Sequence, residues 1–250
     1  MIANPALPIL ADAWLKGLEG MSELGIERIY RHMQKTADDG VDPFPLSLCG
    51  YFNLGTTEAY IEQGFVPHEC DPTQSVSMTL EYAQDDFSMW KMAEALGHTD
   101  DAARYRERSG YWQNHWNDEY GFMQARHQDG SWVEPFDPVT DVDPNDFCEA
   151  SSWIYSWFVP HDVPAMMERM GGPAAVVERL DSYFDGGHHD IGNQPGFHVP
   201  YLYAFAGRPD KTQVQLRELL AKFDDSPHGL PGNDDAGAMS AWFLFGALGF

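Results

Sequence analysis

The sequence predicts an all-α protein whose helices close into a ring, a toroidal α/α barrel. Apolar residues recur at helical spacing along most of the chain, and two kinds of helix alternate. One kind is amphipathic with a polar back, and the other is rich in aromatic residues and poor in charge. A helix that is apolar on all sides is buried, so the alternation indicates inner helices wrapped by outer ones. An α-solenoid of stacked pairs is the alternative, but no fixed repeat period is visible.

The amphipathic helices have the clearest pattern. Apolar side chains stand at i, i+3, i+4 and i+7 over Ile26–Met33 and over Leu216–Phe223, and a related spacing covers Val176–Phe184. The aromatic-rich helices are expected over residues 5–17, 79–96, 149–159, 197–206 and 238–248. Glycine and proline separate the segments, as in Gly171-Gly172-Pro173. One β-hairpin is predicted, with Gly121–Arg126 as a strand and a turn at residues 128–130.

Composition limits the choice of partners. The chain has 250 residues, with 39 acidic against 15 basic residues and a net charge of −24. This charge repels phosphate backbones and anionic lipids, so we expect neither nucleic acid nor a membrane as a partner. Neutral ligands and divalent metals stay open. The first residues show no signal peptide. We expect one domain over residues 1–250.

Polar clusters occur where inner helices are expected to begin. In a closed ring the inner helices run the same way, so the turns that begin them share one rim. Four clusters fall there, at residues 81–86, 146–149, 192–195 and 232–235. Convergence of acids and amides at one mouth is typical of a binding or catalytic site.

The residues of these clusters suit sugar chemistry. Aromatic rings stack on the C–H faces of a sugar, while acids and amides bind its hydroxyl groups. Glycoside hydrolysis needs a protonated carboxylic acid on one side of the scissile bond and an ionised one on the other. Glu149 enters an aromatic segment, which favours the protonated form, and Asp234 and Asp235 beside Asn233 are placed to orient water. Aromatic stripes are also common in plain protein cores, and this reading stays open.

Several segments resemble, in order, the calcium-dependent exo-acting α-mannosidases of glycoside hydrolase family 92. The residues that carry the resemblance are Ser77-Met78-Thr79-Leu80-Glu81-Tyr82-Ala83-Gln84-Asp85-Asp86, Glu149 with Trp153 and Tyr155, Gly192-Asn193-Gln194-Pro195 with His198, and Leu230-Pro231-Gly232-Asn233-Asp234-Asp235 through Trp242. The matches cover nearly the whole chain.

The resemblance implies an (α/α)6 catalytic domain that removes terminal α-linked mannose, with α-1,2 linkages as the expected substrate, by inverting displacement. It implies Glu149 as general acid and Asp235 as general base, with Asn233 and Asp234 in the same catalytic cluster. Inversion places the two carboxyl groups about 6.5–9.5 Å apart. The resemblance also implies two further sets of residues: Asn193 and Gln194 for calcium, and Trp153, Tyr155, His198 and Trp242 for the substrate.

The chain departs from the family pattern at three places. Gln194 stands where the family has Glu, which removes a charge from the calcium site. Ser151 and Ile154 replace amide residues near the acid. The family's N-terminal β-sandwich and first barrel hairpin have no counterpart here, so we expect an incomplete barrel whose partner is the missing N-terminal domain. The full-length protein is expected to be secreted or periplasmic. A non-catalytic mannoside-binding module and a hydrolase of another α-glycoside are the alternatives.

Overall fold

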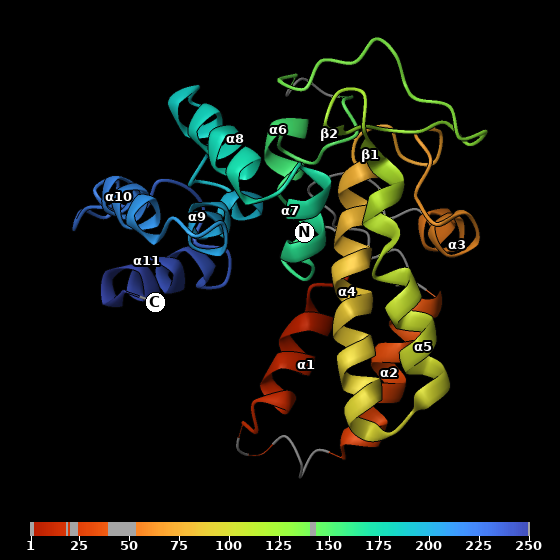
Figure 1. Cartoon of the computed structure of the whole chain (residues 1–250). Helices are drawn as coiled ribbons and strands as arrows, with labels where there is room; N and C mark the ends of the chain where they lie inside the picture. Colours follow the sequence, from red (N-terminus) through yellow and green to blue (C-terminus); the bar gives the residue numbers. More distant parts are fainter. Residues whose placement is uncertain (1–2, 19, 21–24, 40–53, 141–143, 250) are drawn as a thin grey trace. The chain divides into compact units, whose positions relative to one another are not determined.

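The computed structural model describes residues 3–18, 20, 25–39, 54–140 and 144–249 (Figure 1). These residues form two compact units, Met1–Ser152 and Trp153–Phe250. Each unit is described by itself below.

The first unit is organised around one long helix, α4 (Ser75–Leu96), which ends at Gly97 with a left-handed backbone (φ 84°). Four helical elements pack against it: α1 (Ala6–Leu15), α2 (Ile26–Asp39), α5 (Thr99–Arg108) and the 3-10 helix η1 (Tyr111–His115) (Figure 1). A further helix, α3 (Leu54–Gln63), packs on α2. Met89 and Met92 of α4 meet Leu7 and Tyr30 in the core, which follows from the apolar spacing of these helices.

The acidic cluster of α4 differs from the prediction. The helix begins at Ser75 rather than near Thr79, so residues 81–86 lie inside it and not in a turn that begins it. Asp86 is buried, and its Oδ2 accepts hydrogen bonds from Arg108 Nε and from the Tyr60 hydroxyl, both at 2.8 Å. Arg108 also donates to Asp38 on α2 at 2.9 Å. This part of the cluster ties helices together, because a buried charge needs a partner.

A small antiparallel sheet follows η1. Strand β1 (Trp116–Asn117) pairs with β2 (Phe122–Met123), and the turn between them ends at Gly121 with φ 69°. The predicted turn at residues 128–130 is present: Arg126 and Trp132 form an antiparallel bridge, the His127 N–H donates to the Ser131 carbonyl at 2.8 Å, and the Val133 N–H donates to the Ala125 carbonyl at 3.0 Å. The regular strand pairing instead joins β2 to the preceding strand β1. The turn between them forms because Asn117 accepts the Gly121 N–H with its carbonyl and the Glu119 N–H with its side chain.

The second unit is a set of shorter helices. Its elements, with α6 crossing the boundary between the units, are α6 (Ser152–Tyr155), α7 (Val163–Arg169), α8 (Pro173–Asp185), η2 (Gln194–Gly196), η3 (Val199–Tyr201), α9 (Leu202–Phe205), α10 (Pro209–Leu220) and α11 (Ala238–Leu248). Helix α8 packs on α7 and α9, and α10 packs on α9, η3 and α11. Ile191, Leu216, Leu219 and Trp242 form a buried cluster between them.

Two predicted aromatic helices are much shorter than expected. Residues 149–159 contain only the four residues of α6, and residues 197–206 contain η3 and α9. Glu149 has φ 51°, which does not continue into a helix, and Pro200 lacks the N–H that a longer helix needs. Beyond α6, Trp157 and Phe158 donate to carbonyls three residues earlier, as in tight turns. Aromatic burial here does not require a regular helix.

The remaining predicted helices are confirmed, except that α10 ends at Leu220 and leaves Phe223 of the predicted pattern outside the helix. Helix α11 matches residues 238–248 at both ends. None of the helices among the described residues has both the length and the apolar character that crossing a membrane requires.

Candidate active site

Two loops of the second unit bring predicted site residues together. Residues 190–193 lead into η2, which begins at Gln194, and residues 231–237 precede α11. The amide Nε2 of Gln194 donates a hydrogen bond of 2.5 Å to Oδ2 of Asp235. The side chain predicted for calcium and the side chain predicted as the general base are therefore neighbours, although 41 residues separate them in sequence.

The neighbouring carboxylates Asp234 and Asp235 have different surroundings. Oδ1 of Asp234 accepts the backbone N–H of Ser240 at 2.9 Å, and the Asp234 carbonyl accepts the N–H groups of Gly237 and Met239. Asp234 thus fastens the turn to the first residues of α11. Asp235 has a left-handed backbone (φ 47°), and its side chain is exposed. The turn holds one carboxylate and leaves the other accessible.

Asn193 and Asn233 stand at equivalent places in the two loops, each directly after a glycine. Asn193 is half-buried and precedes η2, and its carbonyl accepts the Gly196 N–H at 3.2 Å. Asn233 is exposed two residues before Asp235. Both amides lie in the loops that the Gln194–Asp235 hydrogen bond joins.

The predicted substrate residues Trp242 and His198 are tied to backbone carbonyls. Trp242 is buried, its Nε1 donates to the Phe197 carbonyl at 2.9 Å, and its ring stacks on Phe223 with centroids 5.9 Å apart. The Nε2 of His198 donates to the Trp157 carbonyl at 2.7 Å, and burial lowers the pKa of His198. His198 is therefore a neutral ring at pH 7 whose Nδ1 is an acceptor. Trp242 supports the loops from inside the core.

Trp153 is half-buried, and the ring of His188 lies flat on it with centroids 4.6 Å apart. The guanidinium of Arg179 stands 5.2 Å from the centre of the same indole. Tyr155, by contrast, is buried with its ring edge toward Phe158. No spacing in the sequence connects His188 with Trp153, so their stacking could not be predicted.

Glu149, the predicted general acid, lies in the first unit and its side chain is exposed. The loop before it is clamped to the start of α4. Asp146 is buried with φ 67°, and its Oδ1 accepts from Ser75 Oγ at 2.7 Å. The Cys148 N–H donates to Ser77 Oγ at 2.9 Å. This anchoring fixes the backbone that carries Glu149.

Two further residues support this loop and were not singled out from the sequence as parts of a site. His68 Nδ1 lies 2.9 Å from Oδ1 of Asp146, and Asn145 Nδ2 donates to the Ala150 carbonyl at 2.9 Å, across Glu149. No spacing in the sequence connects His68 with Asp146, because they are 78 residues apart. Since Glu149 belongs to the first unit and Asp235 to the second, convergence of the clusters at residues 146–149, 192–195 and 232–235 at one rim stays a prediction.

The donor set near Gln194 fits calcium rather than a softer metal. Ca²⁺ takes carboxylate, amide and carbonyl oxygens. Asn193 and Gln194 offer amide oxygens, and donation from Gln194 Nε2 leaves its Oε1 for a cation. Among the described residues, no group of three or more His, Cys, Asp or Glu could hold a metal ion, so neutral oxygens would have to supply much of the site.

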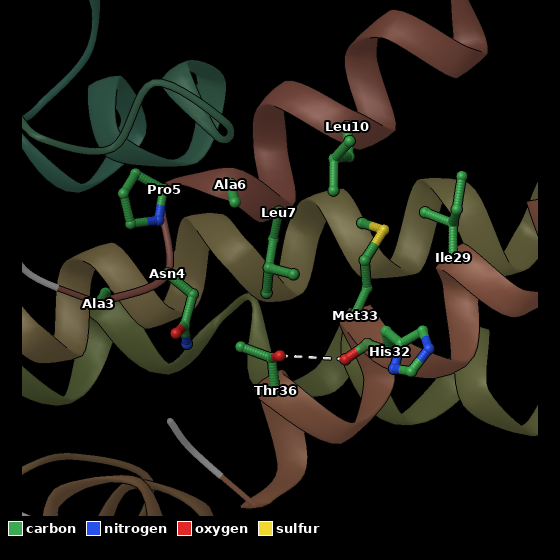
Figure 2. Close-up of a pocket in the computed structure, with 10 residues that line it drawn as sticks. All are labelled: Ala3, Asn4, Pro5, Ala6, Leu7, Leu10, Ile29, His32, Met33 and Thr36. Atoms are coloured by element: carbon green, nitrogen blue, oxygen red, sulfur yellow. Dashed lines mark hydrogen bonds between the residues drawn. The ribbon is translucent and has the colours of Figure 1, made fainter. Parts of the chain in front are cut away.

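A cavity of about 530 Å³ lies between α1 and α2 in the first unit (Figure 2). Figure 2 shows Leu7, Leu10, Ile29 and Met33 along it, and the ten lining residues include none of the predicted catalytic ones. Its apolar wall is unsuited to a polyhydroxylated ligand.

Comparisons with known proteins define the class first. A curated relative from Arthroderma benhamiae, described as an uncharacterized secreted glycosidase, is 29% identical over 271 residues, covering 96% of this chain and 34% of the relative. The structure of a family GH92 α-mannosidase from Bacteroides thetaiotaomicron is 34% identical with a TM-score of 0.86, covering 100% of this chain and 32% of that one. A family GH92 inverting mannosidase from the same organism is 30% identical with a TM-score of 0.84, covering 100% of this chain and 36% of that one. The fold is that of α/α-barrel glycosidase catalytic domains, as predicted.

The sequence pattern of the Glycosyl hydrolase family 92 catalytic domain matches residues 1–250. The chain belongs to this family of glycosidases, which confirms the resemblance seen in the sequence. The chain spans about a third of the length of the relatives it matches.

Proposed function

We propose that this chain carries the catalytic groups of an inverting exo-α-mannosidase, with Glu149 as general acid and Asp235 as general base. Family membership supports the glycosidase class. The observation that carries the assignment of the base is the accessible Asp235 carboxylate, held by Gln194 and set apart from the neighbouring Asp234.

The proposed reaction is one displacement at the anomeric carbon of a terminal α-mannose. Glu149 gives its proton to the glycosidic oxygen as the bond from that oxygen to C1 breaks. Asp235 takes a proton from the water whose oxygen forms the new bond to C1 on the opposite face. Asn233, two residues before Asp235, orients this water. The product is β-mannose, and one proton has moved from Glu149 to the leaving group and one from water to Asp235.

Calcium is the proposed cofactor, and Asn193 and Gln194 would hold it through their amide oxygens. When bound, it supplies positive charge that binds vicinal sugar hydroxyls. Trp153 and His198 are proposed to bind the sugar directly. Tyr155 and Trp242 are proposed to act by supporting that surface from inside, because both are buried.

The proposal extends to the longer protein. Mannose-containing glycans are the proposed substrates, supported by a related α-mannosidase whose structure contains mannoimidazole. Among their linkages we propose α-1,2. We propose that both units form one catalytic domain, because one family pattern spans residues 1–250. An N-terminal domain is the proposed partner, since the relatives are about three times longer. Secretion is supported by the description of the curated relative, and a periplasmic location is the alternative.

The test is hydrolysis of an α-1,2-linked mannobiose by the chain, alone and joined to the N-terminal region of a relative, with the product anomer followed by NMR. We expect β-mannose to form first. Glu149→Gln and Asp235→Asn should each lower kcat about 100-fold or more, because each removes a proton-transfer group. Glu178→Gln, at an exposed position of α8, is the matched control and should leave kcat unchanged. α-Mannose as first product, or full activity of Asp235→Asn, would refute the mechanism.

A second candidate is a mannoside-binding module without turnover. The neutral Gln194 favours it, because one less charge weakens a calcium site. Under this reading neither the parent nor Glu149→Gln turns over, and calorimetric binding of mannose survives the substitution. A third reading, an enzyme for another α-glycoside, is separated by assaying α-glucosides beside α-mannosides.

A further inference from the structure

The two loops that carry Gln194 and Asp235 cross each other at two glycines. A Cβ atom built on Gly232 would lie 2.7 Å from the Cα and 2.8 Å from the carbonyl carbon of Gly192, and closer still to the Gly192 carbonyl oxygen. A Cβ on Gly192 would lie 3.0 Å from the Pro231 carbonyl oxygen and 2.9 Å from Oδ1 of Asp190. Nonbonded carbon atoms normally stay about 3.5–4.0 Å apart. Only glycine fits at position 232, whereas a Cβ at position 192 would require the Asp190 side chain and the Pro231 carbonyl to shift.

The glycines are needed here for contact and not for backbone conformation. Neither has a positive φ angle, unlike Gly237 in the same turn (φ 95°). The neighbours of a Cβ on Gly232 are backbone atoms, which cannot rotate away as a side chain can. The crossing is therefore a fixed point between the two loops.

In both loops, the glycine at the crossing is only a few residues before the predicted site residue. Gln194 is two residues after Gly192, and Asp235 is three residues after Gly232. The loop from Gly192 is itself fixed, because Asp190 Oδ1 accepts the Gly192 N–H at 2.7 Å. The loop from Gly232 is fixed by Asp234, which accepts the Ser240 N–H. The segments from Gly192 to Gln194 and from Gly232 to Asp235 are both short. The distance between the two backbones at the glycines therefore determines where Gln194 meets Asp235.

We infer that Gly192 and Gly232 are paired positioning residues, whose close backbone approach sets the Asp235 carboxylate against the Gln194 amide. Their importance for catalysis rests on the proposed function of Asp235. A methyl group at Gly232 forces the loops apart by roughly 1 Å, and a displacement of this size in a catalytic group costs about 100-fold in rate.

The test compares Gly232→Ala with Gly246→Ala in the full chain. Gly246 lies within α11, where an added Cβ would meet Leu220 at an ordinary 3.5 Å, so this variant controls for adding a methyl group. The readout that does not depend on turnover is the side-chain amide signal of Gln194 in ¹⁵N NMR, with Asp235→Ala marking the signal of the broken hydrogen bond. We expect the Gln194 amide signal of Gly232→Ala to shift to its position in Asp235→Ala, and that of Gly246→Ala to stay at its position in the parent.

In the α-mannoside assay, Gly232→Ala should lose about 100-fold in kcat with KM changed less than about threefold. Gly192→Ala is the milder variant, because one of the two atoms it meets belongs to a side chain. A parent-like Gln194 signal in Gly232→Ala would overturn the inference. Unfolding of both Gly232→Ala and Gly192→Ala would also overturn it, because the crossing would then be required for the fold alone. A parent that shows the coupled signals but has no activity, even when joined to the N-terminal region of a relative, would refute the proposed function and leave the positioning role standing.

Discussion

The imidazole of His188 lies on the indole of Trp153, with ring centroids 4.6 Å apart and planes inclined by 7°. The ring of Tyr183 on α8 is near both, with its centroid 6.0 Å from that of Trp153 and 6.5 Å from that of His188. The residue that the sequence assigned to sugar binding is therefore held by a side chain from a loop that was not assigned to the site.

This stack leads to the first prediction. His188→Ala should lower the free energy of unfolding by about 0.5–1.5 kcal/mol, the contribution of an aromatic pair, and should raise KM for an α-mannoside because Trp153 loses its support. Urea unfolding and steady-state kinetics measure the two effects. His188→Phe keeps a flat ring and should restore both. A KM equal to that of the parent in His188→Ala would separate Trp153 from sugar binding.

The second prediction distinguishes the two adjacent carboxylates. Asp234→Asn keeps an oxygen that accepts the Ser240 N–H, so it should retain stability and most of kcat. Asp234→Ala loses this acceptor and should lower the free energy of unfolding by about 1 kcal/mol. Asp235→Asn should lose activity without losing stability. Thermal unfolding beside kinetics on the three variants tests this, and a larger loss of kcat in Asp234→Asn than in Asp235→Asn would reverse the assignment.

The third prediction concerns pH. Burial raises the pKa of Glu81 from its ordinary 4.5 to about 8. The folded chain therefore binds more protons than the unfolded chain between these values, so stability falls as pH rises from about 4.5 to 8. A tenfold difference in proton affinity corresponds to about 1.4 kcal/mol.

Urea unfolding at pH 5 and pH 8 measures this slope. Glu81→Gln removes one titrating group and should flatten the fall, with its gain in stability seen at pH 8 and not at pH 5. Glu58→Gln, at an exposed position of α3, should follow the parent at both values. A parent that is equally stable at pH 5 and pH 8 would contradict the raised pKa of Glu81.

The sequence was sufficient to predict the helical fold class and those helices whose ends are marked by residues next to them. Helix α11 lies between Gly237 and Gly249, both left-handed, and its bounds were predicted at both ends. Relations between distant segments were not predictable in this way. The crossing of Gly192 and Gly232 and the clamp of Asp146 by His68 depend on tertiary packing, which no spacing within one segment encodes.

The acidic cluster of α4 shows why the site was predicted only in part. Glu81, Asp85 and Asp86 resemble a catalytic rim by composition, yet Asp85 accepts the Asn4 N–H at 3.0 Å and Asp86 is bound by Arg108. Composition does not tell a buried structural carboxylate from an accessible one. The hydrogen-bond partners of each carboxylate make this distinction, and those partners lie on other segments of the chain.

The last prediction concerns calcium and the neutral Gln194. Gln194→Glu adds a charge to the oxygen donors and should tighten calcium binding about tenfold, measured by calorimetry. A glutamate cannot donate to Asp235, and two carboxylates would then face each other where the amide and Oδ2 are now 2.5 Å apart. Without calcium, Gln194→Glu should therefore unfold at a lower temperature than the parent, and calcium should reverse the difference. Gln213→Glu, at an exposed position of α10, adds the same charge away from the loops and should change neither property. Equal calcium affinity in the parent and in Gln194→Glu would show that residue 194 is not a ligand, and would move the calcium site away from these two loops.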